Sequence, residues 1–196
     1  GKTPTNMLLF GTPSKLFDGS QTEDLFYSFL ETGYARRCLF GYGTQGIRST
    51  NGQTPEVIYQ KLIQPQNSLT IEKWSGIFYK LADPTRFNWH VEVEDDVAIA
   101  LIRYRLHCEK VADNLPDHKE IQKAELAHRY FKALKLAGAY AFVDGATTID
   151  LNCLKQAILL VEESGDAFQV ILNREKTYVK LAKYIASEGT ELTHAD

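Results

Sequence analysis

Two adjacent arginines and one threonine are the residues whose type and position best suit chemistry on a phosphate. Arg36 and Arg37 stand at the entry of a predicted strand, directly after Gly33, which ends a predicted helix. A guanidinium held there by rigid backbone can bind phosphate and stabilise the charge that develops on a transferred phosphoryl group, often in a neighbouring subunit's site. Thr12 follows another predicted strand, where open α/β sheets bind their ligands.

Each of these residues also has a purely structural interpretation. The arginines could form ion pairs with Glu31, Asp24 or Glu23, or donate to the carbonyls at the end of the preceding helix. Thr12 could stabilise the turn before Pro13. The sequence leaves both interpretations open.

The phosphate-binding motifs of this chain are incomplete. Residues 41–46 read G-x-G-x-x-G after a predicted strand, but residues 47–52 continue as a loop where that motif needs a helix N-terminus. Residues 1–3 read Gly-Lys-Thr, as at the end of a P-loop, yet Pro4 and the strand after it exclude the helix that such a lysine must open. We therefore predict that the chain does not hydrolyse ATP alone.

No metal site is predicted. The alternation of residues 90–94 places Glu92 and Glu94 on a solvent face, and Asp95 or Asp96 suits a helix cap. The five histidines show no zinc-ligand spacing. Three widely spaced cysteines within apolar patterns indicate reduced thiols in the core.

The first fifty residues predict a small α/β unit. Residues 6–10 and 37–40 are short apolar runs typical of strands covered on both faces, and residues 22–33 form an amphipathic helix between them. Such a unit needs further strands to make a sheet, and the chain does not obviously supply them. A glycine-rich loop follows, so we place a domain boundary between residues 52 and 53.

The remainder, residues 53–196, is predicted to be helical, with short connections that favour an antiparallel bundle. The predicted fold is therefore mostly α with a small α/β portion. In chain order the predicted segments are a helix from Pro55 to Ile63, a short element at 74–81, an extended segment at 90–94, a helix from Asp95 to Val111, a long helix from Pro116 to Asp144, a helix from Asp150 to Leu172, and a last helix containing Tyr178, Leu181 and Ile185.

Composition excludes several classes of protein. Apolar residues make up 44% and charged residues 24% of the 196, as in ordinary globular domains, and no apolar run is long enough to cross a bilayer. We therefore expect a cytoplasmic protein. The net charge of −3 argues against an autonomous DNA-binding domain.

Both ends of the chain look cut in the sequence. The first predicted strand begins almost at Gly1 with no partner before it. Thr193 and Asp196 have the spacing of a capping box for a helix that would follow. We therefore expect an internal piece of a larger protein.

Four segments together resemble a known family. Residues 6–13, NMLLFGTP, and residues 30–40, LETGYARRCLF, resemble the end of the ATPase core of bacteriophage and plasmid primase-helicases. Residues 124–161 resemble the helical region behind that core, and residues 181–196 resemble the lead into a winged-helix domain. The resemblance covers most of the chain and rests on apolar positions around one glycine and one arginine.

The resemblance implies a ring-forming, ATP-driven replicative helicase that acts on single-stranded DNA in a phage-infected bacterial cell, with or without a fused primase. Residues 1–52 would be the end of a RecA/AAA+-like core. Thr12 would lie near the γ-phosphate, and Arg36 or Arg37 would complete the site of a neighbouring subunit. ATP and Mg²⁺ would bind to the parent protein, because Walker A and Walker B motifs have no counterpart in these residues.

Two other functions fit the same sequence. The first is a non-enzymatic helical interaction or assembly module whose N-terminal strand pairs with a partner chain. The second is a complete nucleotide-binding enzyme that uses the glycine-rich loop. Binding of ATP, NAD or S-adenosylmethionine would distinguish the second from the others.

Overall fold

The structure is a computed structural model that describes residues 7–12, 16–43, 52–63, 68–173 and 177–188. Helices dominate these residues, and a two-stranded parallel sheet is the only sheet among them. The mostly α prediction is therefore confirmed. Loop residues 44–51 and the chain's last eight residues lie outside the described residues, together with the motif positions predicted there.

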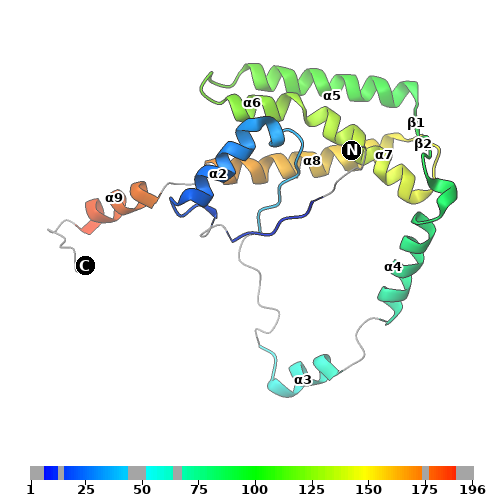
Figure 1. The fold of residues 1–196 in the computed structure, drawn as a ribbon, viewed down its shortest axis with the longest axis horizontal. Coiled ribbons are helices and arrows are strands. Elements are labelled where there is room, and N and C mark those ends of the chain that lie inside the picture. Colours follow the sequence, from blue (N-terminus) through cyan, green and yellow to red (C-terminus); the bar gives the residue numbers. More distant parts are fainter. Residues whose placement is uncertain (1–6, 13–15, 44–51, 64–67, 174–176, 189–196) are drawn as a thin grey trace.

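Figure 1 shows the order of the elements along the chain. The helices and strands are α2 (Gln21–Phe29), the π-helical segment η1 (Leu30–Tyr34), α3 (Pro55–Ile63), α4 (Ser68–Leu81), the 3-10 turn η2 (Pro84–Arg86), β1 (Glu92–Val93), α5 (Asp95–Asp113), α6 (Glu120–Ala127), α7 (Arg129–Asp144), β2 (Thr148–Ile149), α8 (Leu151–Leu172) and α9 (Thr177–Glu188).

Helices α5 to α8 form an antiparallel bundle, whereas the predicted bundle had the last helix of the chain as its fourth member. In Figure 1, α5 runs opposite to α6 and α7, and α8 returns beside α7, while α4 extends away from the bundle. Small residues let the helices of the core approach closely, since Ala133, Ala137 and Ala141 of α7 are fully buried against Val97 of α5 and Val161 of α8.

The α7–α8 hairpin is well specified by its end residues. Gly145 ends α7 in the left-handed conformation with φ 75°, and the Asp150 carboxylate caps α8 by accepting a hydrogen bond from the Cys153 backbone N–H at 2.6 Å. Between them, β2 pairs in parallel with β1, Val93 opposite Ile149. Both helix ends were predicted and are confirmed.

The two predicted strands are not formed. Met7 to Phe10 are extended but unpaired among the described residues, with side chains 66% to 90% exposed. In the segment predicted as the second strand, the Phe40 backbone N–H donates to Ser164 Oγ of α8 at 2.7 Å and not to a neighbouring strand. A strand needs a sheet to complete its hydrogen bonds, and the described residues offer only β1 and β2.

The long helix predicted from Pro116 to Asp144 is also wrong. The chain is helical from Glu120, and it breaks at His128, where φ is −104° and ψ is 0°. No glycine or proline marks this break, so the apolar periodicity runs through it.

None of the described helices is both long and apolar enough to cross a membrane.

Candidate functional site

The backbone around Arg36 is fixed by its own local hydrogen bonds. Ser20 caps α2, which continues into η1, where Gly33 adopts φ 91°. The Arg37 N–H then donates to the Tyr34 carbonyl at 2.8 Å, and the Cys38 N–H donates to the same oxygen at 3.0 Å. A side chain at Gly33 would be strained at this φ, which explains a glycine here. Gly33 therefore turns the chain, as predicted, and Arg36 lies on a closed turn.

The same turn is anchored to the helical bundle. Leu30 and Ala35 are 1% and 2% exposed, and they form one buried cluster with Phe168 of α8. The Phe40 ring stacks on Phe168, with ring centroids 4.5 Å apart. Arg36 thus directly follows the buried residue Ala35, and the partly buried Phe40 packs on the bundle four residues after it.

Arg36 has no ion pair or hydrogen-bond partner among the described residues. Its half-buried side chain folds back over Gly33, where a Cβ would lie 3.2 Å from Nε and from Nη2. The proposed structural partners are not used: Glu31 lies close by without an ion pair, and Glu23 accepts instead from the Gly19 backbone N–H at 2.8 Å.

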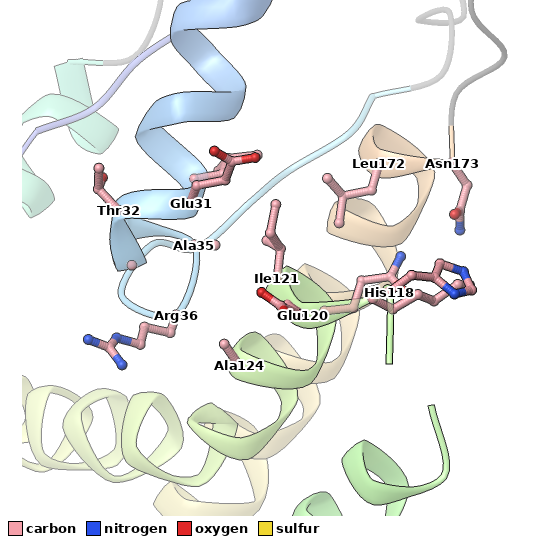
Figure 2. A pocket seen from close by; sticks show the side chains of 14 residues that line it. Glu31, Thr32, Ala35, Arg36, His118, Glu120, Ile121, Ala124, Leu172 and Asn173 are labelled. Atoms are coloured by element: carbon pink, nitrogen blue, oxygen red, sulfur yellow. The ribbon is translucent and has the colours of Figure 1, made fainter. Parts of the chain in front are cut away.

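Arg36 lies at the edge of an open pocket of about 780 Å³ between η1, the start of α6 and the end of α8. Figure 2 shows Arg36 and His118 on opposite sides of it. Its charged walls carry both signs, with Glu31 and Glu120 beside Arg36 and Lys119. The remaining lining residues are Leu30, Thr32, Gly33, Ala35, Ile121, Gln122, Ala124, Leu172 and Asn173.

The other two predicted site residues do not join Arg36. Arg37 and Thr12 are exposed, and neither lines the pocket. The Thr12 carbonyl accepts from the Leu16 N–H at 3.0 Å, as expected for a turn residue. No hydrogen bond or ion pair between described residues connects Thr12 to either arginine.

A buried network of charged side chains lies directly behind the turn. Glu125, 0% exposed, accepts from Arg129 Nε at 2.9 Å and from Lys132 Nζ at 2.8 Å. The Lys132 ammonium also donates to the Ala35 carbonyl at 3.4 Å. At the other end Arg129 donates to Glu162 at 2.7 Å, and Tyr104 donates to the second Glu162 oxygen. The network therefore connects α5 to the residue before Arg36.

Comparison of this chain with protein-family models, with curated proteins and with solved structures finds no match.

The network favours the charged arginine and the neutral tyrosine. Burial lowers the pKa of Arg129, but the carboxylates of Glu125 and Glu162 outweigh it, so the pKa lies above its ordinary value. Burial and the hydrogen bond to Glu162 raise the pKa of Tyr104. Both groups therefore keep their protonation state across the physiological range. Groups that do not change protonation state are suited to a structural role and not to proton transfer.

The cysteines and carboxylates offer no further chemistry among the described residues. All three thiols are free, and burial raises the pKa of Cys38, Cys108 and Cys153, so they remain protonated near neutral pH. Within the residues that the structure describes, no group of three or more acidic, histidine or cysteine side chains could hold a metal ion.

Sequence reasoning missed the buried network. The apolar periodicity puts Ile121, Leu126, Tyr130, Leu134, Ala137 and Ala141 on one face, and Leu126, Ala137 and Ala141 are indeed buried. The periodicity gives no sign that Glu125, Arg129 and Lys132 are buried as well. Alternating charges at spacings of four and three residues mark one helical face, and they usually indicate a solvated one. Gly165, in the middle of α8, was the other available indication, because a glycine inside a helix often permits a close approach.

Gly165 leaves space for Arg129, and this gives a testable prediction. A Cβ at Gly165 would lie 2.1 Å from Arg129 Nη2 and 2.2 Å from Cζ, so the buried guanidinium would have to leave its carboxylates. We expect Gly165→Ala to lower the free energy of unfolding in urea by about 1–3 kcal/mol. Gly138→Ala is the control, since its Cβ would meet only Ile149 Cδ1 at 3.8 Å. It should be neutral or stabilising by up to about 1 kcal/mol. Equal stability changes in the two variants would contradict this account.

Proposed function

We propose that this chain is the part of a phage-type primase-helicase that supplies a trans-acting arginine to the ATP site of a neighbouring subunit. In this proposal Arg36 is that arginine, and the helical bundle holds its turn in place. ATP and Mg²⁺ bind in the parent protein and not on this chain, the subunits form a ring, and the ring moves along single-stranded DNA during replication.

One observation carries the proposal: Arg36 is fixed in position but has no charge partner among the described residues. An arginine with a structural role would pair with one of the nearby carboxylates or with the carbonyls of α2. Its backbone instead lies on a closed turn beside a buried ion network, and its guanidinium is left for a group outside these residues. A phosphate oxygen of a neighbouring subunit's nucleotide is such a group.

Thr12 is proposed as a weaker contributor. It lies at the end of the exposed Met7–Phe10 segment, whose apolar side chains would be buried once other strands cover them. In that arrangement Thr12 would contact the γ-phosphate, and Arg37 would stay at the surface. This part of the proposal depends on a sheet that the described residues do not contain.

The existence of the activity is tested first. The protein expressed from its complete coding sequence should hydrolyse ATP, and single-stranded DNA should stimulate the rate. Calorimetry should detect no more ATP binding to the chain of residues 1–196 than to a protein of similar size that has no nucleotide site. The proposal is wrong if the complete protein hydrolyses no ATP, either with or without DNA.

A second function, a helical assembly module, has its own observation. Tyr178, Leu181 and Ile185 of α9 form an apolar face that is 47% to 67% exposed, and Met7 to Phe10 are 66% to 90% exposed. Unburied apolar faces of this kind indicate a partner surface. A module of this class should be oligomeric by light scattering without nucleotide or DNA, whereas the helicase proposal expects ligand to promote assembly.

A further inference from the structure

The outer face of α5 carries an apolar stripe that the bundle leaves uncovered. Ile99, Ile102 and Leu106 are 51%, 55% and 59% exposed, and we call them the α5 stripe. Their spacing of three and then four residues places them on one face of a continuous helix. The opposite face packs on the bundle, where Val97 and Cys108 are buried. Figure 1 shows α5 along one edge of the bundle, with α6 and α7 on one side of it.

This pattern is typical of a helix that packs against another helix on both of its faces. Single exposed apolar side chains are ordinary at a protein surface, but three of them in line along two turns form a contiguous patch. Positions with this spacing are also those that meet the partner in a pair of helices. The inner face of α5 has its partners in α6, α7 and α8. The α5 stripe has none among the described residues.

The charges beside the α5 stripe differ between its two ends. Asp95 and Asp96 stand in the first turn of α5, and Lys110 stands in its last turn. Neither Asp95 nor Lys110 has an ion pair among the described residues. This distribution also suits the helix dipole, which favours acidic residues at the start and basic residues at the end. The dipole does not explain the apolar residues between them.

We propose that α5 binds a second copy of this chain, with the two α5 stripes packed antiparallel about a twofold axis. Ile99 and Leu106 lie at equal distances on either side of the centre of the α5 stripe, and Asp95 and Lys110 share the same centre. The register that sets Ile99 opposite Leu106 of the second copy therefore also sets Asp95 opposite its Lys110. A parallel pair would instead bring like charges together at both ends.

This symmetry is the reason to infer a second copy and not another protein. A twofold contact uses the same surface on both chains, so that surface must carry both halves of every pair. The outer face of α5 does so for its apolar pair and for its ion pair. A partner of different sequence would not require the acidic and basic ends to lie symmetrically about the α5 stripe.

The other charges of α5 set the details of this contact. Glu109 is already paired with Arg105 at 2.7 Å within the helix. Asp113 lies about one turn beyond Lys110, past the first residue of the facing α5. Arg103 lies near the twofold axis, beside Arg103 of the second copy, which is an unfavourable contact. Removal of that positive charge should therefore strengthen the dimer.

The size of the contact predicts a weak dimer. With 19 residues, α5 is about 28 Å long, so one pair of these helices makes an interface at the small end of specific contacts. The ion pairs at the two ends are exposed, and they favour the register more than they add affinity. We therefore expect a dissociation constant in the micromolar range.

This inference goes beyond the proposed function, because it does not involve Arg36 or ATP. A ring needs a head-to-tail contact that continues from subunit to subunit, whereas a twofold contact is complete after two copies. The mass of two chains therefore indicates the α5 contact, and larger ligand-dependent species indicate the ring. Each proposal can fail while the other holds.

Sedimentation equilibrium of the chain of residues 1–196 tests the contact. The average mass should rise from one chain to two across the micromolar range, without nucleotide or DNA. Ile102→Asp should weaken association at least about tenfold, because it places a charge in the centre of the α5 stripe. Leu159→Asp is the matched control, since Leu159 of α8 is 51% exposed outside the α5 stripe and its replacement should leave association unchanged.

A charge exchange tests the register. Asp95→Lys and Lys110→Asp each set like charges opposite one another in the dimer, so each variant alone should associate more weakly than the wild type. An equimolar mixture of the two variants restores both opposite-charge pairs and should form a mixed dimer. Arg103→Gln should associate more tightly than the wild type. Unchanged urea midpoints would show that each variant folds.

The proposal is overturned if the wild-type chain stays monomeric throughout this range, or if Ile102→Asp and Leu159→Asp change association equally. It is also overturned if the mixture of the two exchanged variants associates no better than either alone. Loss of association in Leu181→Asp but not in Ile102→Asp would place the contact on α9 and not on α5.

Discussion

Replacement of Glu125 by glutamine is expected to lower the free energy of unfolding by about 3–5 kcal/mol. The glutamine keeps the size of the side chain but removes the charge that two buried cations share. Arg129 would retain Glu162, whereas Lys132 would lose its carboxylate and keep only neutral acceptors, the glutamine oxygen and the Ala35 carbonyl at 3.4 Å. An ammonium that is buried without a carboxylate is the main reason for the expected loss.

Urea unfolding followed by circular dichroism measures this loss. Glu109→Gln is the matched control, because Glu109 pairs with Arg105 through an i, i+4 contact at 2.7 Å on the surface of α5. An exposed pair of this kind contributes about 0.3–0.5 kcal/mol, so the control should unfold nearly as the wild type does. If both variants lose the same small amount, Glu125 is not the centre of the network.

A triple variant separates charge from packing. Glu125→Leu, Arg129→Met and Lys132→Leu together remove every charge that the glutamine variant leaves unbalanced. Apolar replacement of a whole buried ion network is often neutral or stabilising. The triple variant should therefore unfold at a higher urea concentration than Glu125→Gln. If the triple variant is less stable than Glu125→Gln, the charged network contributes more to the stability of the fold than the pairing of its charges alone.

The parts of this fold that could be predicted are those specified by local residues. Asp150 has a side-chain oxygen that reaches the N–H groups of a helix start, and Gly145 tolerates the left-handed conformation that ends a helix. Pro55 likewise begins α3 where the sequence places it. These rules depend on a few neighbouring residues, so one sequence is enough to apply them.

The parts that could not be predicted depend on distant partners. Residues 6–10 have the apolar composition of a buried strand, but a strand forms only beside another strand, and Met7 to Phe10 have none among the described residues. The break at His128 similarly leaves no mark in the apolar spacing. The burial of Arg129 and Lys132 likewise involves Glu162 and the Ala35 carbonyl, which lie far away in the sequence.

The candidate site divides in the same way. Arg36 and Arg37 could both be named as candidates from the sequence, because they follow a glycine at the entry of a predicted strand, but the sequence does not choose between them. That Arg36 lines a pocket while Arg37 does not depends on how η1 packs against α6 and α8. The exposure of Trp74, Phe78 and Tyr79 on α4 was not anticipated, because apolar rings on a predicted helix ordinarily indicate a buried face. Only their exposure in the folded chain shows otherwise.

Replacement of Arg36 by alanine is expected to lower the kcat for ATP hydrolysis by the complete protein about 10³-fold. A trans-acting guanidinium stabilises charge that grows on the transferred phosphoryl group, so its loss affects the transition state more than bound ATP. The dissociation constant for ATP should therefore change little. Arg36→Lys should recover only part of the rate, because an ammonium lacks the planar fork of donors.

Arg37→Ala is the control, since Arg37 neighbours Arg36 but is exposed and lies outside the pocket. It should retain most of the wild-type rate. Urea unfolding of all three variants should match the wild type, because Arg36 has no partner to lose within the described residues.

The most direct measurement is the DNA-stimulated rate of ATP hydrolysis by the complete protein with Arg36→Ala, made alongside its affinity for ATP. The account predicts a rate about 10³-fold below the wild type with the affinity for ATP preserved. An unchanged rate would contradict it, and so would an equal loss in the Arg37→Ala control.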